Sequence, residues 1–351
     1  MNPDGRARAR HLVVDLNSSA PHLRLPSWVA GALVDRALDG WRVTVVTSPT
    51  IAIGDGANLV GAETLAAIAD AEVYFGFEVP ASLLDAAPML RWAHSAAAGV
   101  GSSVTSTLRA HGAVLTNSAG IYADAIADTT LAGVLHFVRG LDVAVRQQAA
   151  SHWDQLPFVL GACETRELAE YRVLVVGAGG IGSAVARRFS SLGCACVGIR
   201  RRPSLGIPDG CVRVAGPDTL DTELRLADVV VLAAPQTEAT RALLDARRLA
   251  LLPAGAIVVN VARGGLVADE ALLEALDAGR IRGAVLDVFH TEPLPPFSPY
   301  WQHSRVLVTP HVSGVSPRRQ WARALALFED NWRRWVAGSP LRNVVDLDAG
   351  Y

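Results

Sequence analysis

An apolar strand, a glycine-rich turn and a helix follow one another directly near the middle of the chain, in VLVVGAGGIGSAVARRFSSLG at 173–193. In this G-x-G-x-x-G pattern Gly177 permits a tight turn, Gly179 lets the backbone approach a pyrophosphate, and Gly182 allows the helix to pack closely on the strand. The stretch therefore predicts a dinucleotide-binding unit within a parallel α/β sheet. The turn residues predicted to bind the cofactor are Gly177, Gly179, Gly180, Ile181 and Gly182.

The next apolar run, CACVGIR at 194–200, ends where such a unit usually carries an Asp or Glu for the ribose. This chain has Arg200, Arg201 and Arg202 at that point. A guanidinium cannot accept a hydrogen bond from a 2′-hydroxyl, but it can bind a 2′-phosphate bidentately. NADP is therefore the predicted preferred cofactor and NAD the alternative, with Arg200 and Arg201 on the phosphate and Arg202 toward solvent. A solvated basic loop is the other interpretation of the same residues.

Short apolar runs alternate with helix-favouring stretches on both sides of residues 121–150. From residue 171 onward most runs are continuously apolar, which is typical of strands covered on both faces. Residues 121–150 themselves favour helix, link the two series, and are predicted to contact a partner subunit. Residues 317–337 are predicted to form a helix that returns to the first domain. The pattern predicts an α/β fold with two doubly wound parallel sheets.

Composition excludes several classes of function. With 351 residues, half of them hydrophobic, the chain can bury the cores of two domains. The net charge of −2 argues against nucleic acid, and the lack of a long apolar run argues against a membrane, so we expect a cytoplasmic location. All 32 basic residues are arginine, which excludes Schiff-base chemistry and a Walker lysine. The four cysteines lack metal-ligand spacing, and neither a metal site nor a disulfide is predicted.

Three further stretches lie at predicted strand ends: NVARGGLVADEALLEAL at 260–276, LDVFHTEPLP at 286–295 and VLVTPHVSG at 306–314. Together with the glycine turn, and in this order, they make the chain resemble the D-isomer-specific 2-hydroxyacid dehydrogenases over nearly its whole length. The resemblance implies a flavodoxin-like substrate-binding domain of residues 1–117 and 312–351. It also implies a Rossmann-type cofactor domain of residues 118–311.

The resemblance also implies three catalytic residues. The arginine that matches Arg263 binds the substrate carboxylate, for which its planar fork is suited. The histidine that matches His311 donates a proton to the carbonyl oxygen, and the carboxylate that matches Glu292 is its partner. Taken alone, each has a structural interpretation: Arg263 could pair with Asp269, His311 could be a hinge residue, and Glu292 a solvated loop residue.

Further residues are implied at the edges of the site. The amides of Ala98 and Gly99 are expected to hold the substrate carboxylate, although Gly101 stands where the family often has Asp. Asp128 stands where the family commonly has Glu. The remaining residues implied to contact the cofactor, with Asp287 beside the nicotinamide, are Pro235, Thr240, Val261, Ala262 and Asp287.

The function implied is NADPH-dependent reduction of a small 2-oxoacid, of the glyoxylate or hydroxypyruvate kind, to the D-2-hydroxyacid. A homodimer is the expected assembly. Two alternatives stay open: oxidation of another small anion such as phosphite or formate on the same scaffold, and a nucleotide-sensing protein like the transcriptional co-repressors of this fold. The sequence does not select the side chain of the substrate.

Overall fold

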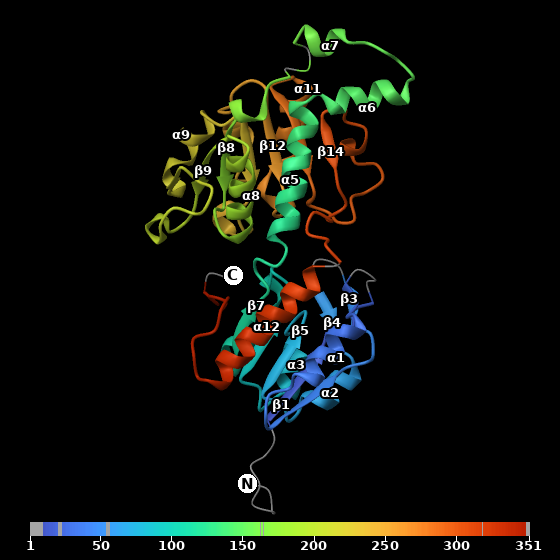
Figure 1. Cartoon of the computed structure of the whole chain (residues 1–351), viewed down its shortest axis with the longest axis vertical. Coiled ribbons are helices and arrows are strands. Elements are labelled where there is room, and N and C mark those ends of the chain that lie inside the picture. Colours follow the sequence, from blue (N-terminus) through green and yellow to red (C-terminus); the bar gives the residue numbers. More distant parts are fainter. Residues whose placement is uncertain are drawn as a thin grey trace, which may run out of the picture. The chain divides into compact units, whose positions relative to one another are not determined.

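The chain divides into two compact units, each with its own parallel sheet (Figure 1). One unit is made of Met1–Ile121 and Ser316–Tyr351, and the other of Tyr122–Val315. The computed structural model describes residues 10–19, 23–53, 57–161, 163, 165–317 and 319–348.

The first unit is built on a five-stranded parallel sheet in the order β2-β1-β5-β6-β7. Its strands are β1 (Arg10–Asp15), β2 (Trp41–Val45), β5 (Val73–Gly76), β6 (Trp92–Ser95) and β7 (Val114–Asn117). A short antiparallel pair, β3 (Ile51–Ile53) and β4 (Ala57–Leu59), lies outside this sheet. The helices of the unit are α1 (Ser27–Asp35), α2 (Ala62–Ile68), α3 (Ala81–Ala86), η2 (Gly101–Ser103), α4 (Ser106–His111) and α12 (Gln320–Val336).

Aromatic packing fixes α12 on this sheet. Phe328 stacks on Phe75 of β5 with ring centroids 4.1 Å apart, and on Trp92 of β6 with centroids 5.4 Å apart. All three side chains are fully buried. Such large buried rings contribute strongly to the apolar area removed from water. The last helix of the chain therefore folds with the first unit, although nearly two hundred residues of the second unit separate it from β7.

The second unit is built on a seven-stranded parallel sheet in the order β10-β9-β8-β11-β12-β13-β14. The chain runs outward from β8 to β10 and then crosses back to β11, so the strand order reverses between β8 and β11. Its strands are β8 (Arg172–Val176), β9 (Ala195–Ile199), β10 (Arg213–Ala215), β11 (Val229–Leu232), β12 (Ala256–Asn260), β13 (Ile281–Leu286) and β14 (Val306–Val308).

Helices cover both faces of this sheet, which explains why its strands are continuously apolar. One face packs against α5 (Ala123–Val138) and α8 (Gly180–Ser191), and the other against α9 (Leu220–Leu224), α10 (Ala246–Leu249) and α11 (Asp269–Asp277). Close approach of α5 requires glycine at two positions. A Cβ on Gly133 would lie 2.6 Å from Val285, and one on Gly283 would lie 2.5 Å from Phe137.

The predicted fold of two parallel α/β sheets is confirmed, and one predicted segment differs in detail. Residues 121–150 form two helices, α5 and α6 (Leu141–Ala149), because Gly140 adopts a left-handed φ of 64° and breaks the helix. After α6 the chain continues into the short α7 (Leu156–Val159) before it reaches β8 (Figure 1). Among the described helices, none combines the length and apolar character needed to cross a bilayer.

Candidate active site

Six loops of the second unit begin at one edge of its sheet, because the carboxyl ends of parallel strands lie together. Each loop follows a different strand, and together they contain every site residue predicted for this unit. The first predicted site residues after β8, β9, β11, β12, β13 and β14 are Gly177, Arg200, Pro235, Val261, Asp287 and His311.

The glycine turn has the close contacts that its sequence predicts. Gly177 has a φ of 97°, and a Cβ there would lie 2.4 Å from the amide nitrogen of Ala234 on the neighbouring strand end. A Cβ on Gly182 would lie 2.3 Å from the carbonyl oxygen of Gly177. Any side chain at either position would push the turn away from the sheet.

The same turn has the features that a dinucleotide needs. A Cβ on Gly179 would meet no atom within 4 Å, so the space outside the turn is open. The amides of Gly180, Ile181 and Gly182 donate to no acceptor within the described part of the chain. They lie at the start of the twelve-residue helix α8, whose N-terminus favours negative charge. The turn therefore fits the pyrophosphate of a dinucleotide.

Arg200 lies directly beside this turn. The amides of Gly177 and Ala178 both donate to the carbonyl oxygen of Ile199, at 2.9 and 3.0 Å, and Arg200 is the next residue. Its guanidinium Nη1 donates to the carbonyl oxygen of Gly206 at 3.3 Å, within the loop that follows β9. Arg201 and Arg202 lie in the same loop and are exposed.

The loop after β11 is closed on itself by two threonines. Thr240 donates through Oγ1 to the carbonyl oxygen of Pro235 at 2.7 Å and accepts from the amide of Thr237 at 2.7 Å. These bonds bring Pro235 and Thr240, five residues apart in the chain, to one side of the loop at the sheet edge.

Asn260, at the end of β12, shapes the loop that carries Arg263. Its side chain accepts from the amide of Ala262 at 3.1 Å and donates to the carbonyl oxygen of Arg263 at 2.9 Å. Arg263 Nη1 donates to the carbonyl oxygen of Ala262 at 2.7 Å. The predicted alternative partner, Asp269, instead accepts from the hydroxyl of Tyr300 at 2.9 Å.

A glycine joins the arginine loop to the loop after β13. A Cβ on Gly264 would lie 2.0 Å from the backbone of Phe289, so only glycine allows these two loops to touch. The amide of Phe289 in turn donates to Glu292 Oε1 at 2.8 Å. The chain after Arg263 and the chain before Glu292 are therefore in contact.

His311 and Glu292 form a hydrogen-bonded pair. His311 Nδ1 lies 2.6 Å from Glu292 Oε2, and 45% of the histidine side chain is exposed. Because the carboxylate accepts, Nδ1 carries the proton of this bond and Nε2 is the nitrogen left for a substrate. His311 has a φ of 52°, in the left-handed region that few residues other than glycine adopt.

Asp287 holds the backbone around His311. Its carboxylate is only 1% exposed and accepts from the hydroxyl of Thr309 at 2.6 Å, from the amide of Val312 at 2.9 Å and from the amide of Ser313 at 3.1 Å. The amide of His311 donates to the carbonyl oxygen of Asp287 at 2.9 Å. The contacts of the carboxylate are thus made with the histidine loop, whereas the expected neighbour was the nicotinamide.

The second unit carries the signature of a known family. Residues 131–313 match the family model for the D-isomer specific 2-hydroxyacid dehydrogenase, NAD binding domain. The chain belongs to the D-isomer-specific 2-hydroxyacid dehydrogenase family. The predicted family resemblance and the prediction of an oxidoreductase are confirmed by this match.

Solved structures of this family resemble the whole chain. A D-isomer specific 2-hydroxyacid dehydrogenase from Xanthobacter autotrophicus Py2, in complex with NADPH and MES, is 31% identical, with a TM-score of 0.77 over 98% of this chain and 100% of that one. An NADPH-dependent glyoxylate/hydroxypyruvate reductase from Sinorhizobium meliloti, in complex with NADP and sulfate, is 27% identical, with a TM-score of 0.78 over 97% of this chain and 100% of that one. A family protein from Aeromonas salmonicida is 26% identical over 97% and 100% of the two chains, with a TM-score of 0.77.

The predicted substrate loop lies in the other unit of the dehydrogenase. Ala98 and Gly99 follow β6 in the first unit, and Ala98 is partly exposed while Gly99 is exposed.

Asp128, which replaces the family's common Glu, lies on α5 and accepts from Arg188 of α8 at 2.5 Å. No group of three or more metal-ligating side chains occurs in the described residues.

Two residues that shape the site, Asn260 and Ser313, lie in the quoted stretches 260–276 and 306–314 but were not predicted as site residues. Asn260 ends an apolar strand, and Ser313 follows the histidine motif. A polar residue at the end of a buried strand is the signal that could have revealed Asn260, because its amide must find partners there. Nothing local marks Ser313, whose hydroxyl donates to Asp287 across 26 residues.

Proposed function

We propose that this dehydrogenase reduces a small 2-oxoacid, of the glyoxylate or hydroxypyruvate class, to the D-2-hydroxyacid with NADPH. The observation that carries the proposal is the 2.6 Å bond between His311 Nδ1 and Glu292 Oε2, at the same sheet edge as the glycine turn. An exposed imidazole with one nitrogen fixed by a carboxylate is suited to deliver a proton from the other nitrogen.

The bound nicotinamide would supply the hydride, and the chain would supply the proton and the orientation. We assign proton delivery to His311 Nε2–H, which would protonate the carbonyl oxygen as C2 accepts the hydride and becomes the alcohol carbon. Glu292 would hold the ring through Nδ1, so that Nε2 is the nitrogen left to face the substrate. In the reverse reaction His311 would accept the proton of the alcohol.

Arg263 is assigned to the substrate carboxylate. Its planar fork can donate two parallel hydrogen bonds to a carboxylate, which also fixes the direction of the neighbouring carbonyl. The bonds of Asn260 hold the backbone of Arg263, and those of Asp287 hold the backbone of His311. We therefore assign Asn260 and Asp287 as positioning residues, and a place for Asp287 beside the nicotinamide stays a prediction.

NADP is the proposed cofactor, and its contacts are assigned to the loops described above. The glycine turn would hold the pyrophosphate, and Arg200 with Arg201 would bind the 2′-phosphate. Support comes from the position of Arg200 one residue after Ile199, whose carbonyl oxygen accepts from two amides of the turn. The relatives from Xanthobacter autotrophicus and Sinorhizobium meliloti were solved with NADPH and NADP. Pro235, Thr240, Val261 and Ala262 would also contact the cofactor.

The experiment that tests the function is a panel of 2-oxoacids assayed with NADPH and with NADH. We expect glyoxylate or hydroxypyruvate to give the highest kcat/KM, with NADPH preferred, and the alcohol product to be the D isomer where C2 is chiral. Phosphite and formate with NADP belong in the same panel. Oxidation of either anion at a higher kcat/KM would replace the proposed reaction, and NADPH binding without turnover of any substrate would favour a nucleotide-sensing protein.

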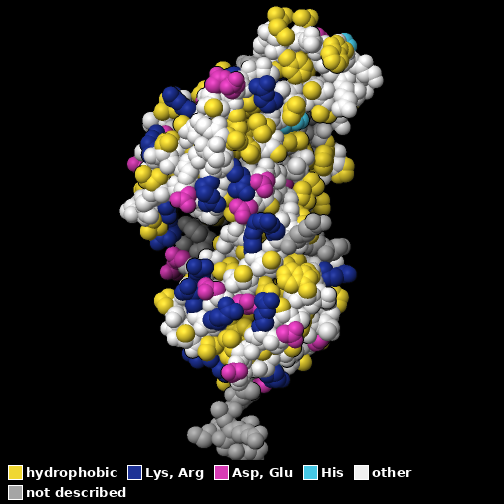
Figure 2. All heavy atoms as spheres, viewed as in Figure 1, with side chains coloured by type: hydrophobic (Ala, Val, Ile, Leu, Met, Phe, Trp, Pro, Cys, Tyr) yellow, Lys and Arg dark blue, Asp and Glu magenta, His cyan; other side chains and the backbone are white. Residues whose placement is uncertain are grey.

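We also propose that the dehydrogenase is a homodimer that uses the segment from α6 to α7. Hydrophobic side chains gather over α7 at one end of the second unit (Figure 2). Several are large and more than half exposed in the single chain, and exposed apolar side chains gathered in one place are typical of an interaction site. The exposed side chains are Val145 (57%), Trp153 (87%), Leu156 (61%), Val159 (74%) and Leu160 (75%).

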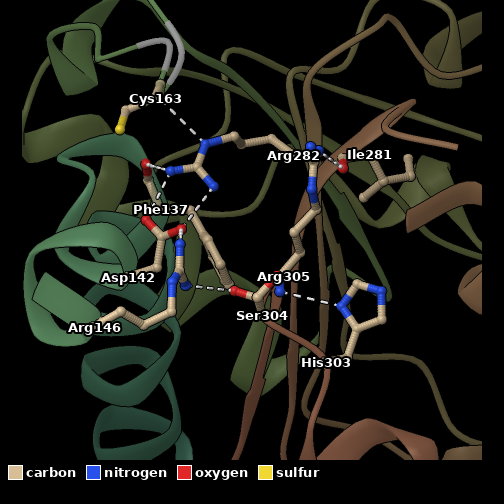
Figure 3. A network of polar contacts seen from close by, with 9 residues as sticks. All are labelled: Phe137, Asp142, Arg146, Cys163, Ile281, Arg282, His303, Ser304 and Arg305. Atoms are coloured by element: carbon tan, nitrogen blue, oxygen red, sulfur yellow. Dashed lines mark hydrogen bonds and ion pairs between the residues drawn. The ribbon is translucent and has the colours of Figure 1, made fainter. Parts of the chain in front are cut away.

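A buried ion pair anchors this segment to the sheet (Figure 3). Arg282 of β13 donates to both carboxylate oxygens of Asp142 at the start of α6, at 2.7 and 3.1 Å. It also donates to the carbonyl oxygens of Phe137 and Cys163, each at 3.1 Å. The end of α5, the start of α6 and the chain returning from α7 thus meet at one guanidinium. The segment with the exposed apolar side chains is therefore attached to the sheet by buried hydrogen bonds.

Replacing Leu156 and Leu160 together by Asp is expected to convert the dimer into monomers. Sedimentation velocity should give twice the monomer mass for the wild type and the monomer mass for the double variant. Replacement of Leu205 by Asp, an exposed leucine of the loop after β9, is the matched control and should leave the dimer intact. A wild type that sediments as a monomer at micromolar concentration would contradict the assembly.

A further inference from the structure

We infer that Asn117, held in place by Asn343, is a positioning residue that orients the substrate-binding loop of residues 96–99. The inference rests on the proposed function, in which the amides of Ala98 and Gly99 bind the substrate carboxylate. Both asparagines belong to the first unit.

The loop presents consecutive unused donors. The amide of Ala97 donates to the hydroxyl of Ser95 at 3.1 Å. The amides of Ala98, Gly99 and Val100, in contrast, donate to no acceptor among the residues that the structure describes. A run of free backbone N–H groups next to one another is a favourable binding place for an anion such as a carboxylate.

The direction of these amides is set through the carbonyl groups before them. In a trans peptide the C=O of one residue points opposite to the N–H of the next. The amide of Ser118 donates to the carbonyl oxygen of Ala97 at 3.0 Å, which turns the N–H of Ala98 away from the end of β7. Asn117 Nδ2 donates to the carbonyl oxygen of Ala98 at 2.8 Å, which turns the N–H of Gly99 the same way. Asn117 therefore fixes the second donor of the proposed carboxylate site.

The side chain of Asn117 is hydrogen-bonded at both its oxygen and its nitrogen, and it is nearly buried. Its Oδ1 accepts from the amide of Ala119 at 3.1 Å, and the residue is 7% exposed. Because the amide group uses both its oxygen and its nitrogen, its orientation is determined: the nitrogen must face Ala98. A carboxylate in the same place could keep the bond to Ala119 but would repel the Ala98 carbonyl and the substrate.

Asn343 holds the backbone of Asn117 from the C-terminal segment of the chain. The amide of Asn117 donates to the carbonyl oxygen of Asn343 at 3.1 Å, and Asn343 Nδ2 donates back to the carbonyl oxygen of Asn117 at 3.1 Å. The same Nδ2 donates to the carbonyl oxygen of Ala119 at 2.9 Å. Asn343 has a φ of 55°, which asparagine tolerates better than most residues.

The segment that carries Asn343 is tied down on both sides. Val344 forms an antiparallel bridge with Thr116, and the amide of Val345 donates to the carbonyl oxygen of Leu115 at 2.9 Å. On the other side, Asn331 of α12 bonds both the amide and the carbonyl oxygen of Arg342, at 2.8 and 3.1 Å. The C-terminal segment thus holds the end of β7 in place through hydrogen bonds.

A buried, neutral histidine also supports the residues around the loop. His94 Nδ1 lies 2.7 Å from the Thr116 hydroxyl, and Nε2 lies 3.3 Å from the Ser118 hydroxyl, which donates to the carbonyl oxygen of Ser95 at 2.9 Å. Burial lowers the pKa of His94 to about 3. His94 therefore supports Thr116 and Ser118 as a neutral ring.

The test is the Asn117→Ala variant of the full chain. We expect KM for the best 2-oxoacid to rise about tenfold, as the loss of one hydrogen-bonded support implies, with kcat changed less than threefold. The Kd for NADPH, measured by fluorescence titration, should stay within twofold of wild type because the glycine turn lies in the other unit. Asn117→Asp should raise KM by about a hundredfold.

A matched control separates positioning from loss of stability. Thr64 is 1% exposed in the same unit and donates to Asp15 at 2.9 Å, so Thr64→Val removes a buried hydrogen bond that involves neither the loop nor the two asparagines. It should lower Tm as Asn117→Ala does but leave KM unchanged. Asn343→Gly, which keeps the left-handed backbone and removes only the side chain, should raise KM threefold to tenfold.

Binding of oxamate, an unreactive 2-oxoacid analogue, to the NADPH-loaded protein gives a readout without turnover. Its Kd should rise about tenfold in Asn117→Ala. A Kd and a KM within twofold of wild type would overturn the positioning role, whatever the wild type turns over. Absence of turnover by the wild type, with weaker oxamate binding in the variant, would overturn the proposed reaction and leave the positioning role standing.

Discussion

His311→Asn is expected to lower kcat for 2-oxoacid reduction by about two to four orders of magnitude, the usual worth of a positioned acid. Asparagine is the sharpest replacement because His311 has a φ of 52°. Asn tolerates this region, so the loop held by Asp287 keeps its shape, while the group that delivers the proton is gone. Stopped-flow measurement of NADPH oxidation at saturating substrate measures the loss directly.

The binding of cofactor and substrate separates chemistry from folding in that experiment. The Kd for NADPH and the Kd for oxamate should each stay within threefold of wild type. Glu292→Gln should lower kcat less, by about tenfold, because the amide can still bond to His311 but carries no charge. A His311→Asn enzyme within threefold of the wild-type kcat would show that His311 is not the acid.

Most of the candidate site in the second unit could be predicted from the sequence, because its residues lie at strand ends within recognisable local patterns. Close contacts require glycine at Gly177, against Ala234, and at Gly182, against Gly177, whereas Gly179 leaves the space outside the turn open. Arg263 and Glu292 follow the buried strands β12 and β13, and His311 follows the partly buried β14. Parallel strands bring these ends together. The predicted approach of Glu292 to His311, 19 residues later, appears as a 2.6 Å bond.

Residues that act through long-range hydrogen bonds could not be found in the same way. Asn343 bonds to Asn117 across 226 residues, and no local period relates the two. Asp287 was assigned to the nicotinamide through the family pattern, but its burial and its bonds to Val312 and Ser313 could be seen only once β13 and β14 were placed side by side. Gly140 interrupts the helical stretch 121–150 through its backbone conformation, which an average helix preference over the segment does not reveal.

The choice between NADP and NAD should depend on the loop after β9. Replacing Arg200 and Arg201 together by Ala is expected to lower kcat/KM for NADPH by about two to four orders of magnitude. One charge-assisted hydrogen bond is worth about 1.5–3 kcal/mol, and two such bonds to a 2′-phosphate add to that range. The value for NADH should change less than threefold, because NADH has a hydroxyl where NADPH has the phosphate. Steady-state assays with both cofactors give the ratio.

Arg202→Ala is the matched control, because it removes the same charge from the same exposed loop but is predicted to face solvent. If the loop acted only as a general positive field, the three arginines would contribute equally and salt would abolish the preference. If the phosphate is bound directly, the loss is concentrated in Arg200 and Arg201, and Arg202→Ala stays within threefold of wild type. A wild type that prefers NADH would contradict the assignment altogether, since a ribose hydroxyl offers these guanidinium groups no anion to bind.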